Sequence, residues 1–154
     1  LNHPATCSTM NGLASILAEM GKLDEAGPMF TKALQGYEAS LGAGHPETLA
    51  SVHNLATMLL DLEQPEAAEA LFRRALDGRE SALGKTHPAT IATVHGFARL
   101  MRMKGEEKES AALLKRFGQE AAVAVLAEAT DELLGTPPQK TPPVPPSLAT
   151  LSIS

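Results

Sequence analysis

Apolar residues recur at helical spacing in two blocks that repeat along the chain. In the first block they lie at positions 13, 14 and 17, and in the second at positions 26, 30, 33 and 34. Residues three or four positions apart share one face of an α-helix, so each block predicts an amphipathic helix. The two blocks recur 42 residues later with many of the same residues. Two helices therefore form one repeated unit.

A His-Pro pair opens each copy of the unit, at positions 3, 45 and 87. The proline suits the first turn of a helix, where its missing N–H costs nothing. In the first unit we expect one helix over about 4–20 and a second over about 23–41. Gly42 follows the second helix and favours its end, because glycine readily adopts the left-handed conformation.

The units cover residues 3–44, 45–86 and 87–128, and the third departs from the pattern in its second half. The helical pattern then predicts a last helix over 119–134, either separate or continuous with the helix before it. A single hairpin cannot bury its apolar face alone, so the units are expected to stack. The predicted fold is all-α, a right-handed superhelical stack of three helix-turn-helix repeats and a C-terminal helix in one domain over 1–134.

Residues 135–154 form a proline-rich tail outside this domain. Repeated prolines exclude a helix and favour the extended polyproline II conformation. Three interpretations of the tail stay open: a disordered end, a segment that docks on another subunit, or a ligand for an SH3- or WW-type groove. The last rests on the P-x-x-P motif at residues 142–145.

Composition narrows the choice of partners and compartment. The chain has 154 residues and is 44% hydrophobic but only 3% aromatic, so Ala, Leu, Met and Val must form most of the core. A net charge of −5 argues against nucleic acid as the partner. No apolar run approaches the roughly 20 residues that a membrane helix needs. The single cysteine, Cys7, favours the cytoplasm or another reducing compartment, with an organelle open if a targeting peptide was removed.

The spacing of large and small residues within each unit resembles the tetratricopeptide repeat, in the 42-residue form found in kinesin light chains. The first unit carries its pattern of large and small residues as Leu13, Ala14, Leu17, Gly21, Ala26, Phe30 and Ala33. The second unit repeats it as Leu55, Ala56, Leu59, Ala68, Phe72 and Ala75. The likeness covers residues 3 to about 117. It implies a stack whose first helices line a concave groove that holds a partner's peptide.

The resemblance assigns the groove to polar residues of the first helices. They are Asn11, Ser15, His53, Asn54, Thr57, Asp61, His95, Arg99 and Arg102. The kinesin-light-chain form would have an asparagine-lined, basic groove for acidic peptides. His53 and His95 could pair with a partner's carboxylate and make binding pH-sensitive. Arg99 and Arg102 share a helical face and could clamp an acidic group, or form an ordinary solvated surface on which Arg102 reaches Glu106.

No residue pattern in the sequence indicates catalysis, a metal or a cofactor. It contains no glycine-rich phosphate loop, no pair of zinc ligands on one turn and no activated nucleophile. The three His-Pro histidines would stand about 10 Å apart in packed helices. A zinc ion needs ligands about 2 Å away, so we interpret these histidines as helix-start residues. Cys7 is expected to be a small core or interface residue, the alternative being a reactive thiol four positions from His3.

These observations predict a non-catalytic protein–protein interaction scaffold. It would bind an extended peptide or a helix in its concave groove. The alternative is a structural accessory subunit of a large multiprotein assembly, which would dock through its convex face, its terminal helix and its proline-rich tail.

Overall fold

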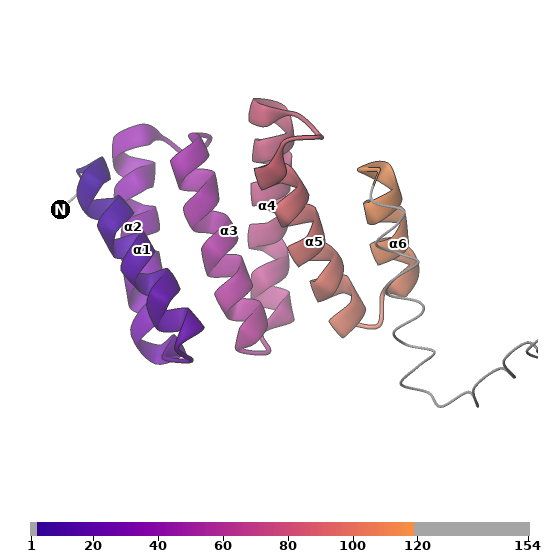
Figure 1. Ribbon diagram of the computed structural model, residues 1–154, viewed down its shortest axis with the longest axis horizontal. Coiled ribbons are helices and arrows are strands. Elements are labelled where there is room, and N and C mark those ends of the chain that lie inside the picture. The colour runs from indigo at the N-terminus through magenta and orange to yellow at the C-terminus, as the bar shows by residue number, and fades with distance from the viewer. Residues whose placement is uncertain (1–2, 119–154) are drawn as a thin grey trace, which may run out of the picture.

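The computed structural model describes residues 3–118 of the chain, and every regular element in that range is an α-helix. The helices follow one another along the long axis of the molecule, from indigo α1 to orange α6 (Figure 1). Their bounds are Pro4–Glu19 (α1), Leu23–Leu41 (α2), Pro46–Asp61 (α3), Pro65–Leu83 (α4), Pro88–Met103 (α5) and Glu107–Arg116 (α6). The predicted all-α stack of helical hairpins is confirmed.

Each His-Pro pair starts a helix through a side-chain hydrogen bond. The backbone N–H groups of Ala5, Glu47 and Ala89 donate to Nδ1 of the histidine two residues earlier, at 3.2, 3.2 and 3.1 Å. A side-chain acceptor at this position satisfies an N–H that has no partner within the helix, which is typically worth about 1 kcal/mol. The histidines are thus helix caps. Within residues 3–118 no three His, Cys, Asp or Glu side chains lie close enough to hold a metal ion.

The turn inside each hairpin needs one residue with a positive φ. Gly21 (76°) and Gly105 (80°) supply it in the first and third units, whereas Glu63 (56°) supplies it in the second. Glu63 is the one non-glycine residue with positive φ in the described range. Only glycine adopts this conformation without a steric cost, so the second turn carries local strain.

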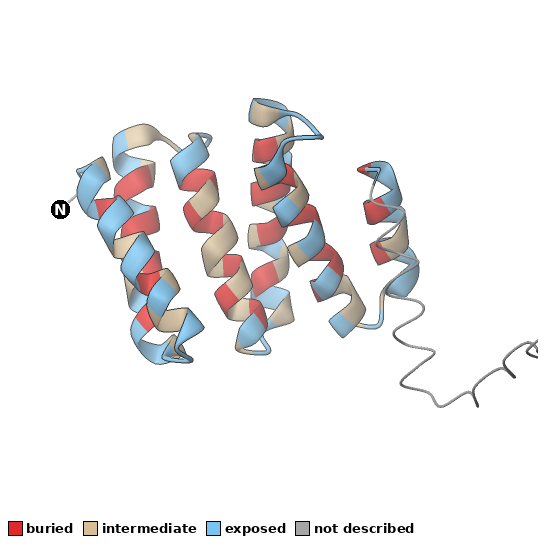
Figure 2. Cartoon of the chain, in the orientation of Figure 1, coloured by how far each residue is buried: buried red, intermediate tan, exposed pale blue. Residues whose placement is uncertain are grey.

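Small residues allow the two helices of a hairpin to approach closely. Ala14 and Ala26 are fully buried between α1 and α2, and Ala56 and Ala68 are fully buried in the second hairpin. Buried residues line the sides of the helices that face one another (Figure 2). A larger side chain at these positions would push the two helix axes apart.

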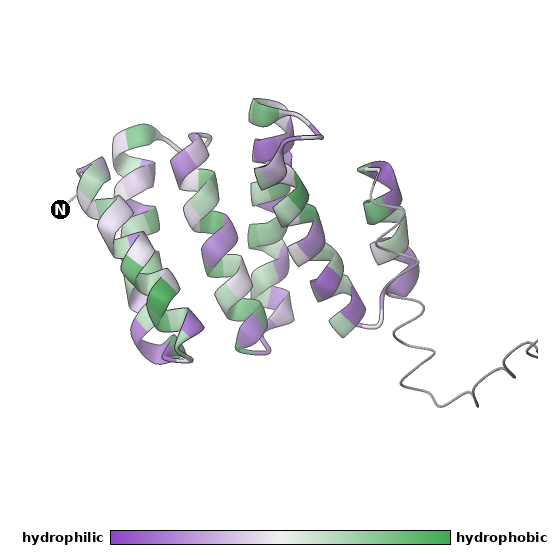
Figure 3. Cartoon of the chain, viewed as in Figure 1, coloured by the Kyte–Doolittle hydropathy of each residue, from purple (hydrophilic) through white to green (hydrophobic). Residues whose placement is uncertain are grey.

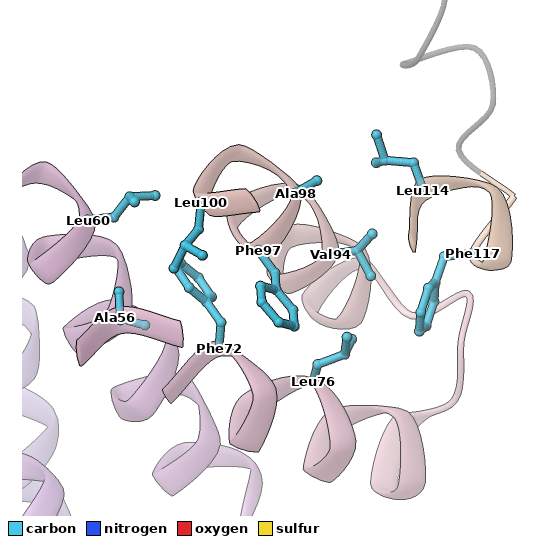
Figure 4. Packing of buried hydrophobic residues seen from close by; sticks show 11 residues of the cluster. Ala56, Leu60, Phe72, Leu76, Val94, Phe97, Ala98, Leu100, Leu114 and Phe117 are labelled. Atoms are coloured by element: carbon cyan, nitrogen blue, oxygen red, sulfur yellow. The ribbon is translucent and has the colours of Figure 1, made fainter. Parts of the chain in front are cut away.

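The largest core cluster joins the second hairpin to the third. The rings of Phe72 (α4) and Phe97 (α5) stack with centroids 6.1 Å apart, and Val94, Leu100 and Leu114 belong to the same buried cluster (Figure 4). Offset aromatic stacking adds to the stabilisation from burial alone. This joint therefore holds the largest buried apolar cluster in the described part of the chain.

The first helices and the second helices form two different layers. α3 contacts both α1 and α5, while α2 and α4 are bridged by the long side chains of Glu38 and Arg74, whose atoms are 2.6 Å apart. Glu80 and Arg116 link α4 to α6 in the same way, also at 2.6 Å. The first helices are thus the more closely spaced layer, which places them on the inner, concave side of the stack.

The last described helix, α6, is shorter than its counterparts α2 and α4. α6 stops at Arg116, and Gly118 has a φ of 70°, so the alternative of a helix continuing into residues 119–134 is wrong. The predicted last helix and the proline-rich tail lie outside the described residues. None of the helices in the described range is long and apolar enough to cross a membrane.

Candidate peptide-binding groove

A cavity of about 240 Å³ opens between the first helices α1 and α3. Its floor is apolar, formed by the buried side chains of Phe30 and Met58. Its rim is polar and includes the exposed carboxylates of Glu19 and Asp61. The remaining lining residues are Ser15, Ala18, His53, Asn54 and Thr57. An apolar floor under a few polar groups is typical of a binding site, and the volume suits one side chain better than a cofactor.

The structure brings together five of the nine residues that the sequence nominated. They line the cavity and are Ser15, His53, Asn54, Thr57 and Asp61. Arg99 reaches the rim through an ion pair in which its Nη2 lies 3.0 Å from Oδ1 of Asp61. Asn11, His95 and Arg102 do not line this cavity. Phe30 was expected only in the core, and periodicity could not show that one edge of its ring would also form a cavity floor.

Hydroxyl groups on the rim have their hydrogens engaged and their oxygens available. Oγ of Ser15 donates to the carbonyl oxygen of Asn11, and Oγ1 of Thr57 donates to that of His53, both at 3.0 Å. The half-buried amide of Asn54 forms no hydrogen bond with any residue in 3–118. A free amide can donate and accept at once, which matches the alternating groups of a peptide backbone.

His53 occupies an apolar setting at the inner end of the cavity. Its ring packs edge-on against Phe72, with centroids 5.8 Å apart, and its Nδ1 is buried without a hydrogen-bond partner in the described structure. Burial, with the positive charge of Arg79 as a second cause, lowers the pKa of His53 to about 4. His53 is therefore neutral near pH 7, and we do not expect it to attract a partner's carboxylate there. His95 is exposed.

Of the two arginines of α5, only Arg99 forms an ion pair within residues 3–118. Arg99 already pairs with Asp61 across the first-helix layer, and both side chains are largely exposed, so the pair contributes little to stability. Glu106 lies 2.9 Å from Nζ of Lys104, so it does not serve as the predicted partner of Arg102. The rim thus has near-balanced charge around Asp61, with Glu19 as an additional negative group.

These features define a helical-repeat protein with a small cavity in its inner groove. A family model for the tetratricopeptide repeat matches residues 5–81 and again 50–116. The chain belongs to the tetratricopeptide repeat family. No curated protein sequence matches it.

Three solved structures are similar to the chain. A kinesin light chain-type protein from Podosopora anserina, with nearly identical TPR-like repeats, is 25% identical, with a TM-score of 0.70 over 79% of this chain. A variant of that protein has a TM-score of 0.69, at the same identity and over the same share of this chain. The chain spans 58% of the first structure's length and 57% of the second's. BtubC (BKLC) from P. vanneervenii is 13% identical, with a TM-score of 0.66 over 96% of this chain and 72% of its own, and shows the shared fold.

Proposed function

We propose that the chain is a protein–protein interaction scaffold that binds an extended segment of a partner along its first-helix layer. One apolar side chain of that segment would enter the cavity between α1 and α3. The observation that carries this proposal is the cavity itself, with a floor of Phe30 and Met58 under a polar rim. The family and its kinesin-light-chain-like relatives support a role in binding proteins, with no catalytic step.

The rim would hold the partner's backbone while the floor selects the side chain. Asn54 lies beside Ser15 and Thr57, so an amide and two hydroxyl oxygens lie within one small area. Each hydrogen bond to a peptide group contributes modestly, about 0.5–1.5 kcal/mol. The side chain in the cavity supplies the apolar burial that gives the larger share of affinity. A leucine-sized residue suits the space and the floor.

The accessory-subunit alternative would use the convex face instead. A hollow of about 480 Å³ lies over the outer face of α4, but its described lining comes from that one helix and is mostly charged. It has no apolar floor comparable with that of the inner cavity. The concave groove is therefore the better supported site, and deletion of residues 135–154 would separate the two roles, because only the accessory subunit needs its tail.

A selection from random peptides tests the proposal directly. Peptides selected on the whole chain should lose about tenfold or more in affinity on Thr57→Arg, which fills the cavity, and a smaller factor on Asn54→Ala. Asp77→Ala on the outer face of α4 is the matched control and should change nothing. Circular dichroism would verify that each variant stays folded. Peptides that bind Thr57→Arg as tightly as the parent chain would refute the groove.

A further inference from the structure

The first helix exposes an apolar stripe that the later first helices keep covered. Leu13, Ile16 and Met20 share one face of α1 and are 45%, 55% and 64% exposed. The visible side of lower α1 is pale blue in Figure 2 and partly green in Figure 3, that is, exposed and hydrophobic. In the described range only one other large hydrophobic side chain, Met103, is classed as exposed. The stripe is therefore a local feature of this end of the stack.

The equivalent positions 42 and 84 residues later show what such a stripe contacts in the other units. Its counterparts in α3 are Leu55, Met58 and Leu62, and all three pack in a cluster with Ala26 and Phe30 of α2. The first two counterparts in α5 are Phe97 and Leu100, which are buried against Phe72 of α4. In both cases the stripe is the contact between a first helix and the second helix of the preceding unit. The same positions in α1 face no such helix.

A charged position on α2 repeats the same relation. Its Lys32 corresponds to Arg74 and Arg116, which pair with Glu38 and Glu80 of the preceding second helix at 2.6 Å. Lys32 is exposed and forms no ion pair with any residue in 3–118. Each of the two glutamates stands eight residues after the phenylalanine of its helix, Phe30 or Phe72. The apolar stripe and Lys32 are therefore both positioned to contact a helix that carries a phenylalanine and, eight residues later, a glutamate.

The connection between units indicates how such a helix would be joined. Thr48 is buried, and its hydroxyl donates at 2.7 Å to the carbonyl oxygen of Gly42, which ends the preceding helix. Thr90 is buried at the corresponding joint, whereas Thr6, the counterpart in the first unit, is exposed. The preceding helix buries Thr48 and accepts its hydrogen bond. No helix in the described range does the same for Thr6.

We propose that the face formed by Leu13, Ile16, Met20 and Lys32 is the stacking surface for one more repeat hairpin joined directly ahead of His3. The second helix of that hairpin presents a phenylalanine and, eight residues later, a glutamate. A second copy of this chain fits poorly, because its last described second helix is α6, where Leu114 replaces the phenylalanine and is already buried. The glutamate position corresponds to Ala122. The proposal does not depend on peptide binding in the groove.

Methionine oxidation in an extended chain tests this surface. A copy of residues 45–86 placed directly before His3 reproduces the natural joint between units and supplies its own phenylalanine and glutamate. Hydrogen peroxide oxidises accessible methionines, so Met20 should react about fivefold more slowly in the extended chain than in the original one. Met103 is exposed at the other end of the stack and is the internal control, with an unchanged rate.

Variants of the extended chain decide between stacking and mere attachment. Phe72→Ala and Glu80→Lys, introduced only in the added copy, should restore fast oxidation of Met20, and Lys32→Glu should restore part of it. Equal oxidation of Met20 in the extended and original chains would overturn the proposal. So would a dimer of the original chain in sedimentation that protects Met20 and is dissolved by Ile16→Glu, since a second copy would then be the occupant.

Discussion

The joint between the first two hairpins and the joint between the last two use equivalent positions but differ in how they fill space. At the second joint Phe72 stacks on Phe97 and lies directly beneath Gly96, where an added Cβ would stand 2.6 Å from the ring. At the first joint the counterparts of Phe97 and Gly96 are Leu55 and Asn54, and a cavity opens above Phe30. The same backbone arrangement thus gives a filled joint or an open groove, depending on two side chains.

Truncating the central ring of each joint should show the largest difference. Phe72→Ala removes the stacked ring from the filled joint and should lower the free energy of unfolding by about 4 kcal/mol. Phe30→Ala should cost about 1 kcal/mol less, because one side of that ring already borders a cavity. Urea denaturation of both variants measures the two losses. An equal or larger loss for Phe30→Ala would contradict the difference in packing.

Acidification should reveal the buried histidine at the inner end of the groove. The pKa of His53 is about 4 in the folded chain, below the ordinary value of 6.5, so the unfolded chain binds the proton more tightly. Stability from this group is full above about pH 6.5 and is lost as the pH falls towards 4, by up to roughly 3 kcal/mol.

The pH dependence of unfolding, measured from pH 7 to pH 4, checks this expectation. His53→Gln should have a flatter curve than the parent chain over that range, because glutamine does not titrate. His95→Gln, at the exposed counterpart in α5, is the matched control variant. Parallel curves for the parent chain and His53→Gln would show that His53 is not held neutral by burial.

A methyl group added at equivalent glycines should have opposite effects at the two ends. Gly96→Ala drives a Cβ into the Phe72 ring and should destabilise the chain by about 1–3 kcal/mol. Gly12, its counterpart in α1, has nothing within 4 Å of the added Cβ, so Gly12→Ala should stabilise the helix by about 0.5–1 kcal/mol. Thermal unfolding of the two variants gives the signs. A stabilising effect of Gly96→Ala would mean that Gly96 is not a packing requirement.

The strained turn of the middle unit should give the smallest effect. Glu63→Gly relieves a positive φ of 56° and should raise stability by about 0.5 kcal/mol, since greater freedom of the unfolded chain offsets part of the gain. Gly21→Ala places the strain in the first unit and should lower stability. Chemical denaturation resolves both changes. A loss of stability in Glu63→Gly would show that the carboxylate side chain outweighs the strain.

The sequence predicted the helices well because their signals are periodic. Ala14 and Ala26 recur at the spacing of a packed hairpin, and both lie where that spacing places them. It predicted the His-Pro pairs as helix starts but not the hydrogen bond from each histidine ring to the next turn, because that bond depends on a side-chain rotamer. Residues 119–134 have a helical pattern too, and the helix predicted there lies outside the described residues.

The candidate site was only partly predictable for a different reason. The period nominated a surface on each first helix, but it could not show which joint would stay open. That outcome depends on the contact between Phe72 and Gly96, residues on different helices of different units. It also could not show that Asp61 would take Arg99 as its partner. The open joint therefore emerged only from tertiary packing.

The most direct test of the groove is to map where a selected peptide touches the folded chain. Amide chemical shifts recorded with and without the peptide should change most around Ser15, Asn54 and Thr57, at the joint that holds the cavity. They should change little around Gly96 on α5 and around Asp77 on the outer face of α4. Largest changes on α4, with none between α1 and α3, would contradict the account.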